Sequence, residues 1–114
     1  TVYGDAAEGF LNEDTPLNPR THYAVSKCAM EMGAAFWRDR LDVRIVRPFN
    51  YTGVGQESRY LIPKIVSHFR DRAPVIELGN LSVKRDFGDV RSVVDAYVSL
   101  ATIDPAQDVF NICT

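Results

Sequence analysis

Apolar and polar residues alternate along the chain in two different periods. Spacing typical of helices marks residues 22–40, 60–72 and 91–102. Alternation and β-branched residues typical of strands mark residues 41–49, 74–78 and 109–113. Because these strands alternate with helices, the pattern predicts an α/β architecture whose strands are at least partly parallel.

Each predicted helix carries apolar positions that we expect to face a core. In the first helix these form a stripe of Met30, Gly33, Phe36 and Trp37. In the third helix they are Val93, Val94, Tyr97, Val98 and Ala101. The second helix contains Pro63, which a helix tolerates in its first turn, where the missing N–H has no intrahelical partner.

Polar, proline- and glycine-containing stretches separate these elements. Residues 4–21 lack apolar periodicity and predict a long loop, a kind of segment that often serves as a lid or a binding loop. Residues 50–58 contain Gly53 and Gly55 and predict a second loop. Residues 85–90 are predicted to lead directly into the third helix.

The 114 residues are 46% hydrophobic and 25% charged, with a net charge of −2, which is typical of a soluble globular domain. No apolar run is long enough to span a membrane and no signal peptide is evident, so we expect a cytoplasmic protein without membrane partners. The mild acidity gives no electrostatic footprint for nucleic acid. Cys28 and Cys113 lack companions at metal-ligand spacing and are predicted to be reduced, buried thiols.

The pair Tyr23 and Lys27 is the strongest chemical signal. Residues four apart on a helix share a face, with Cβ atoms about 5–6 Å apart. A nearby ammonium favours the ionised phenol, so Tyr23 would serve as a general acid or base toward a substrate oxygen. One such spacing is weak evidence by itself, and the alternative is a surface tyrosine and lysine on an amphipathic helix.

Other blocks accompany this pair in a definite order. They are Thr1-Val2-Tyr3-Gly4-Asp5, Glu13-Asp14-Thr15-Pro16-Leu17-Asn18-Pro19, Arg47-Pro48-Phe49-Asn50, Gly53-Val54-Gly55-Gln56, Leu78-Gly79-Asn80-Leu81, Lys84-Arg85-Asp86-Phe87 and Phe110-Asn111-Ile112. The ordered set resembles the second half of the extended short-chain dehydrogenase/reductases, the NAD(P)-dependent epimerases, dehydratases and reductases of nucleotide sugars. The resemblance covers the whole chain.

This resemblance implies the distal part of a Rossmann-like doubly wound parallel sheet over about residues 1–50. A small nucleotide-sugar-binding portion would follow over about residues 51–114. The glycine-rich turn that receives the cofactor pyrophosphate in this family is not in the sequence, and the family's catalytic Ser or Thr would lie just upstream of Thr1. We therefore expect the C-terminal portion of a larger enzyme. The alternative from another class is an inactive substrate-binding fragment.

The resemblance also assigns roles to individual residues. Tyr23 would be the acid or base at the sugar 4-oxygen, and Lys27 would hold the ribose hydroxyls of NAD or NADP. The substrate side would be formed by Asn50, Lys64, Gly79, Asn80 and Arg85, and Pro48 and Phe49 would lie near the nicotinamide.

Arg85 is expected to clamp the diphosphate, for which a planar guanidinium is suited. The alternative for Arg85 is a surface ion pair with Asp86 or Asp89. In this family the helix that carries the Tyr and Lys commonly packs against a partner subunit, which implies a homodimer. His22 is assigned a structural role, and Cys28 is assigned to packing rather than to a role as a nucleophile.

The residue before the Val-Tyr-Gly block bears on the reaction. Sugar 4,6-dehydratases of this family typically carry a Glu there, which removes the proton at C5 during the elimination of water. This chain has Thr1 instead, and a hydroxyl that stays protonated at neutral pH cannot act unaided as that base. This disfavours a dehydratase. The blocks around Asn50 and Asn80 look most like the GDP-sugar branch of the family, which contains GDP-mannose 4,6-dehydratase and GDP-4-keto-6-deoxy-D-mannose reductase. The prediction is reduction of a GDP-4-keto-6-deoxyhexose at C4. A nucleotide-sugar 4-epimerase or 4,6-dehydratase is the alternative.

Overall fold

The structure is a computed structural model, and it describes residues 1–4 and 9–114. Its elements are α1 (His22–Ala35), β1 (Ile45–Pro48), β2 (Asn50–Thr52), α2 (Leu61–Arg70), β3 (Phe87–Asp89), α3 (Val90–Thr102) and β4 (Val109–Ile112). Both strand pairs are parallel, which confirms the predicted α/β class. The start of the predicted loop at 4–21 lies partly outside the described residues.

One extended segment runs through β1 and β2 and changes its pairing partner at Phe49. β1 pairs with β4, placing Ile45 opposite Val109, and β2 pairs with β3, placing Asn50 opposite Phe87. The Phe49 N–H donates to the Ile112 carbonyl at 2.9 Å, the last bond to β4 before the change. β1 and β4 therefore share a sheet, although β1 belongs to the predicted cofactor portion and β4 to the predicted nucleotide-sugar-binding portion. The boundary between these portions near residue 50 stays a prediction.

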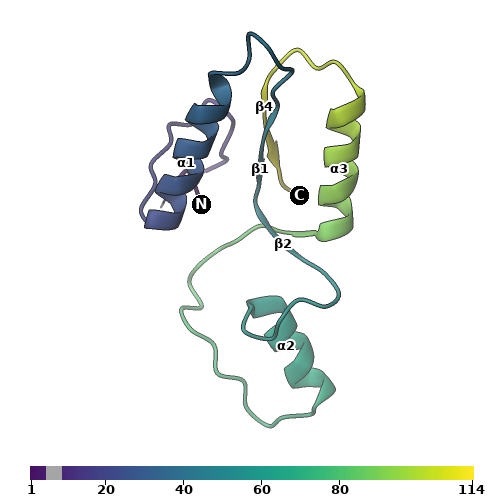
Figure 1. The fold of residues 1–114 in the computed structure, drawn as a ribbon. Coiled ribbons are helices and arrows are strands. Elements are labelled where there is room, and N and C mark those ends of the chain that lie inside the picture. The colour runs from purple at the N-terminus through teal and green to yellow at the C-terminus, as the bar shows by residue number, and fades with distance from the viewer. Residues whose placement is uncertain (5–8) are drawn as a thin grey trace.

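Helices α1 and α3 flank the β1–β4 pair, while α2 and the connection from residue 71 to residue 86 lie at the other end of the molecule (Figure 1). The molecule is elongated, with extents of 57 × 29 × 24 Å. A small core joins Val2, Tyr3 and Cys28, with Leu11 and Phe49 packed against it. This core lies between the N-terminal segment and α1, so it supports the helix that carries Tyr23.

Helix α1 begins where Thr21 caps it, because the Thr21 hydroxyl accepts the Ala24 N–H at 3.1 Å. It ends at Ala35, and turns replace the predicted helix over residues 36–40. The predicted apolar stripe is wrong: Met30, Phe36 and Trp37 are all exposed. The buried face consists of Ala24, Cys28 and Glu31. Small side chains at the first two of these positions allow close approach of the helix to the core.

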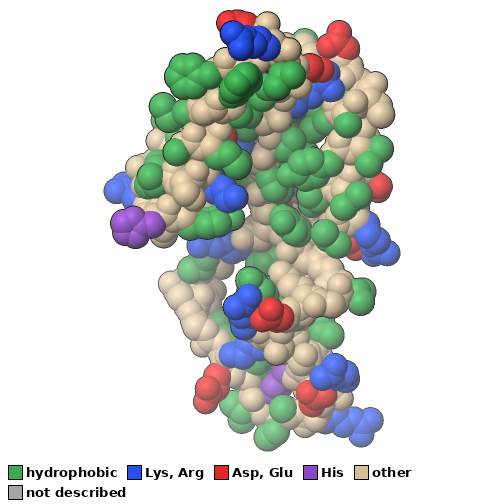
Figure 2. Space-filling model, in the orientation of Figure 1, with side chains coloured by type: hydrophobic (Ala, Val, Ile, Leu, Met, Phe, Trp, Pro, Cys, Tyr) green, Lys and Arg blue, Asp and Glu red, His purple; other side chains and the backbone are tan. Residues whose placement is uncertain are grey.

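Helices α2 and α3 form where periodicity predicts them, and Pro63 falls in the first turn of α2 as required. The predicted inward face of α3 is wrong except at Val93, which is buried; Val94, Tyr97, Val98 and Ala101 are exposed. The physical reason is that pairs of short strands are too narrow to cover a 13-residue helix. Hydrophobic side chains consequently gather on the surface beside α3 and the adjoining strands (Figure 2). None of the described helices has the length and apolar character needed to cross a membrane.

Three further expectations are corrected. Residues 74–78 form no strand, because no strand of the described chain pairs with them. Conversely, residues 50–52 and 87–89, expected as a loop and as a lead into a helix, form β2 and β3 by pairing with each other. Cys28 is buried but Cys113 is exposed, since it follows the end of β4; both are free thiols.

Candidate active site

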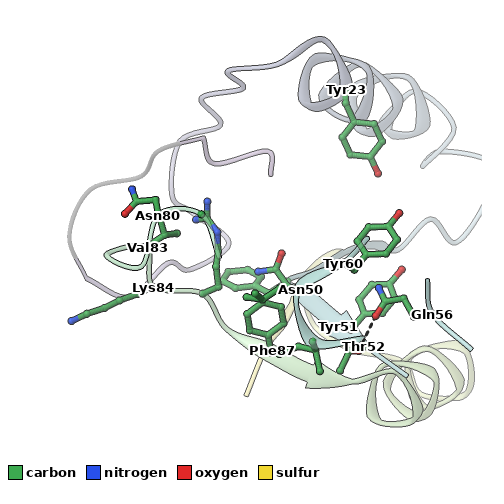
Figure 3. A pocket seen from close by; sticks show the side chains of 15 residues that line it. Tyr23, Asn50, Tyr51, Thr52, Gln56, Tyr60, Asn80, Val83, Lys84 and Phe87 are labelled. Carbon is green, nitrogen blue, oxygen red and sulfur yellow. Dashed lines mark hydrogen bonds between the residues drawn. The ribbon is translucent and has the colours of Figure 1, made fainter. Parts of the chain in front are cut away.

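A cleft of about 1130 Å³ lies between α1, β2, the start of α2 and the connection that precedes β3. Residues from all four segments line it (Figure 3). They are Tyr23, Phe49, Asn50, Tyr51, Thr52, Gln56, Tyr60, Leu61, Ile62, Gly79, Asn80, Val83, Lys84, Arg85 and Phe87. The fold thus brings together residues that are more than sixty positions apart in the chain.

The side chain of Tyr23 extends from the first turn of α1 into this cleft, and its hydroxyl points toward Tyr60 (Figure 3). The tyrosine is 62% exposed, so a ligand can reach its phenol. The Lys27 ammonium lies 5.3 Å from the centre of the Tyr23 ring. The predicted sharing of one helix face by these two side chains is therefore confirmed.

A second pocket of about 360 Å³ adjoins the cleft and contains Lys27 and Pro48. Tyr23, Phe49 and Tyr51 line both spaces. The Lys27 ammonium and the apolar surfaces of Pro48 and Phe49 line this pocket together with the paired Glu31 and Arg47. The ammonium and the apolar surfaces fit a nicotinamide riboside, which offers hydroxyl acceptors beside a planar ring. The cleft holds most of the residues expected to bind the substrate, and the second pocket holds those expected to bind the cofactor. Tyr23 lines both.

We call Asn50 and the lining residues of the connection before β3 the far wall of the cleft, because they lie opposite Tyr23 (Figure 3). Hydrogen bonds to the backbone hold this wall. The Asn50 amide donates to the Asp86 carbonyl at 3.1 Å, which joins β2 to the connection. The Asn80 side chain accepts the Ser82 N–H at 2.9 Å, which fixes the turn at Gly79 and Asn80. These bonds place two of the predicted substrate residues on opposite edges of the same wall.

The charges at this wall are positive. Of the residues that line the cleft in the described part of the chain, only Lys84 and Arg85 are charged, although the chain as a whole carries −2. The Lys84 side chain points away from the cavity centre (Figure 3). Such a wall attracts an anionic ligand.

The carboxylates next to Arg85 have other partners. Asp86 accepts hydrogen bonds from the backbone and hydroxyl of Thr114. Asp89 accepts from the Arg91 guanidinium at 3.0 Å and from the Arg91 N–H at 2.8 Å, and these bonds lower the pKa of Asp89 from its usual 3.8 to about 2. Within the described chain no ion pair joins either carboxylate to Arg85, which argues against the surface-pair alternative.

Lys64 is the one predicted substrate residue that the structure places elsewhere. Its ammonium donates to the Glu77 carbonyl, and it lines a separate pocket with Ser58 and His68 on the other side of α2. The half-buried His68 belongs to that pocket as well. Lys64 therefore tethers the connection to α2 in this structure.

Sequence reasoning did not assign Tyr51, Gln56, Tyr60 or Phe87 to the site. Tyr51 follows Asn50 on β2, and Gln56 accepts a hydrogen bond from the Thr52 hydroxyl at 2.8 Å. The Gly53-Val54-Gly55-Gln56 block was a usable signal for Gln56. For Tyr60 the only local cue is its place immediately before α2, so its position in the cleft depends on the fold.

The family model described as "NAD dependent epimerase/dehydratase family" matches residues 1–113, and the chain belongs to this enzyme family. Two curated relatives match over 99% of the chain. The GDP-6-deoxy-D-talose 4-dehydrogenase of Aggregatibacter actinomycetemcomitans is 37% identical, with 38% of its length covered. The GDP-6-deoxy-D-mannose reductase of Pseudomonas aeruginosa is 35% identical, with 40% of its length covered. The chain thus spans about two fifths of the length of these relatives.

Solved structures show the same relationship. A protein from Burkholderia cenocepacia J2315 is 53% identical and superposes with a TM-score of 0.93, over 98% of this chain and 37% of that one. The structure of RMD from Pseudomonas aeruginosa complexed with NADPH is 34% identical and gives a TM-score of 0.86, over 98% of this chain and 41% of the other. The predicted family is therefore confirmed, and the α/β fold with parallel strands matches it.

Proposed function

We propose that the protein containing this chain is an NAD(P)H-dependent reductase of a nucleotide sugar, acting on C4 of a GDP-4-keto-6-deoxyhexose. The observation that carries the proposal is the cleft, which has the accessible Tyr23 phenol at one side and, among the residues 1–4 and 9–114, only cations as charged lining residues. A nucleotide sugar has the matching layout, with a hexose beside a diphosphate. The names of the two curated relatives, both enzymes of GDP-6-deoxyhexoses, support the same substrate class.

On the substrate side, Arg85 is proposed to hold the diphosphate through its planar fork of N–H donors. Asn50 and Asn80 add neutral polar contacts from the two edges of the wall, and Gly79 lets the backbone pass close to the nucleotide. Tyr51 lines both pockets, and its side chain is proposed to contact the hexose between them.

At the reacting carbon, Tyr23 is proposed to donate its phenolic proton to the 4-oxygen. When bound, the reduced nicotinamide supplies the hydride to C4, so one hydride and one proton convert the ketone to an alcohol. Lys27, close to the Tyr23 ring, stabilises the phenolate that the proton transfer leaves behind. Pro48 and Phe49 give the nicotinamide side of the site an apolar surface. We propose NADPH as the cofactor, in line with the RMD complex.

The assembly is proposed to be a homodimer through α1. Met32 and Phe36 on and next to this helix are 67% and 86% exposed. Light scattering on the full-length protein is expected to give twice the chain mass, and replacing both residues by Ser is expected to give the mass of one chain.

The full-length protein tests the activity directly. With GDP-4-keto-6-deoxymannose we expect NADPH oxidation, followed at 340 nm, and one 6-deoxyhexose product. Proton NMR of the product then assigns the C4 configuration, which distinguishes 6-deoxymannose from 6-deoxytalose and so gives the face of attack. Interconversion of two nucleotide hexoses without net NADPH consumption would instead establish a 4-epimerase, and loss of water from GDP-mannose would establish a dehydratase.

A further inference from the structure

A buried ion pair, Glu31 with Arg47, lies in the wall of the second pocket, beside Lys27 and Pro48. The Arg47 Nε donates to Glu31 Oε1 at 3.0 Å, and its Nη2 donates to Glu31 Oε2 at 2.8 Å, a two-pronged contact. The two side chains are only 10% and 9% exposed. We propose that Arg47 and Glu31 are positioning residues, which lock the carboxyl end of β1 to α1 and thereby set the place of Tyr23 relative to Asn50. This proposal rests on the proposed function.

The sequence positions of the pair connect it to the chemistry on both sides. Glu31 lies four residues after Lys27 and eight after Tyr23, so the three form one stripe along α1. Arg47 immediately precedes Pro48 and lies three residues before Asn50. A shift of either partner therefore moves one wall of the site relative to the other.

Arg47 also binds the N-terminal part of the chain. Its Nη1 donates to the Tyr3 hydroxyl at 2.8 Å and to the Glu13 carbonyl at 3.1 Å. The Tyr3 hydroxyl in turn donates to the Asn111 side chain at 2.7 Å, and the Asn111 N–H donates to the Glu13 carboxylate at 2.6 Å. The Arg47 guanidinium thus joins β1, α1 and the segment before α1, and Tyr3 and Glu13 extend this network to β4. These bonds, above all those to Glu31, raise the pKa of Arg47, which keeps its charge at any pH the protein meets.

A buried ion pair of this kind adds little to the stability of a fold. Removing two charges from water offsets most of their attraction, and well-packed apolar side chains of similar size often serve a fold equally well. A bidentate guanidinium and carboxylate, in contrast, fix both distance and angle. Apolar contacts are not directional, so they would leave β1 freer to slide against α1. Since a displacement of about 1 Å can cost a reaction roughly a hundredfold in rate, orientation is the property that the pair contributes.

The test replaces both members of the pair in the full-length protein, as Glu31→Leu with Arg47→Met, so that no charge is left buried without a partner. We expect a Tm within a few degrees of the wild type, a KM for the nucleotide sugar within about threefold, and a kcat lower by about 10- to 100-fold. The matched control removes the Arg38 and Asp108 ion pair (3.5 Å), which is more exposed and lines neither pocket. Its double variant, Arg38→Met with Asp108→Leu, is expected to keep kcat.

If the Glu31 and Arg47 double variant has the kcat and the Tm of the wild type, the proposal is overturned, because a pair that serves only stability has no effect on kcat in a protein that stays folded. If the double variant does not fold, Arg47→Lys keeps the charge and removes the two-pronged contact; we expect it to lower kcat about tenfold, and an unchanged kcat would overturn the proposal.

The kcat ratio is measured on whichever nucleotide hexose the wild type converts, so an error in the assigned reaction leaves this test intact. If the wild type converts none, the proposed function fails, and a crystal structure of the double variant decides. A change of 1 Å or more between the Tyr23 hydroxyl and the Asn50 amide supports positioning, and an unchanged separation contradicts it.

Discussion

The two sides of the cleft are built in different ways. We call the segment before α1 together with α1, β1, α3 and β4 the framework region, and α2 with residues 71–86 the binding region. The residues that the structure shows as buried all lie in the framework region, which also holds the Arg47 and Glu31 pair. Helix α2 buries none of its residues, and the connection after it contains neither helix nor strand.

The difference corresponds to what each region is proposed to do. Proton donation from Tyr23 depends on a fraction of an ångström, so its helix is fixed by a core and an ion pair. The attraction that draws a diphosphate toward Arg85 falls only with the inverse of distance, so the segment that carries Arg85 tolerates more movement than α1 before the guanidinium fork engages the anion. The Lys64 contact to the Glu77 carbonyl and the Asn50 contact to the Asp86 carbonyl are such bonds. The buried residues and the buried ion pair are therefore concentrated in the region that carries Tyr23.

The sharpest test of this contrast is Tyr23→Phe. Loss of the phenolic proton is expected to lower kcat by about 10²- to 10⁴-fold, because general acid catalysis typically contributes that much. GDP affinity by calorimetry and Tm are expected to stay unchanged, since the ring and its packing remain. Turnover at the wild-type rate would remove Tyr23 from the mechanism.

The second test addresses the binding region through Arg85→Ala. We expect the Kd for GDP to rise about 10- to 100-fold, the range for hydrogen bonds between a guanidinium and an anion, with kcat at saturating substrate within about threefold. The control is Arg70→Ala, an exposed arginine paired with Asp71 at 2.8 Å and outside the cleft. Equal GDP affinity in wild type and Arg85→Ala would leave Arg85 as a surface residue.

A smaller effect is expected from Lys64→Met, which removes the tether to Glu77 while keeping an unbranched apolar side chain. The binding region then loses one hydrogen bond, and we expect KM for the nucleotide sugar to rise roughly two- to fivefold with kcat unchanged. A rise as large as that in Arg85→Ala would mean that Lys64 contacts the substrate itself.

The smallest effect concerns Asp89, which caps α3 at the junction of the two regions. Its pKa is lowered in the folded protein to about 2, so its contribution to stability is complete above its ordinary value of 3.8 and is lost as the pH falls through 2. We expect Asp89→Ala to lower Tm by a few degrees at pH 7 and by progressively less between pH 4 and pH 2. A constant difference in Tm across that window would show that the charge is irrelevant.

The sequence also predicted the two regions unequally. In the framework region the Tyr23 and Lys27 pair could be found because a helix makes neighbours of residues four apart. In the binding region the residues Asn80 and Arg85 were found only through a family resemblance, since the turns that carry them have no periodicity. The contribution of Tyr60 to the cleft had no such cue.

What the sequence determined by itself are the features that arise over a few residues: the three helices, the first-turn place of Pro63, and the common face of Tyr23 and Lys27. Tertiary structure alone decided which helix faces are buried, where β2 and β3 pair, and that residues 74–78 have no partner. It also decided the meeting of Glu31 with Arg47. The physical reason is that helical hydrogen bonds close within four residues, whereas a strand or a buried charge is stable only if a distant part of the chain supplies its partner.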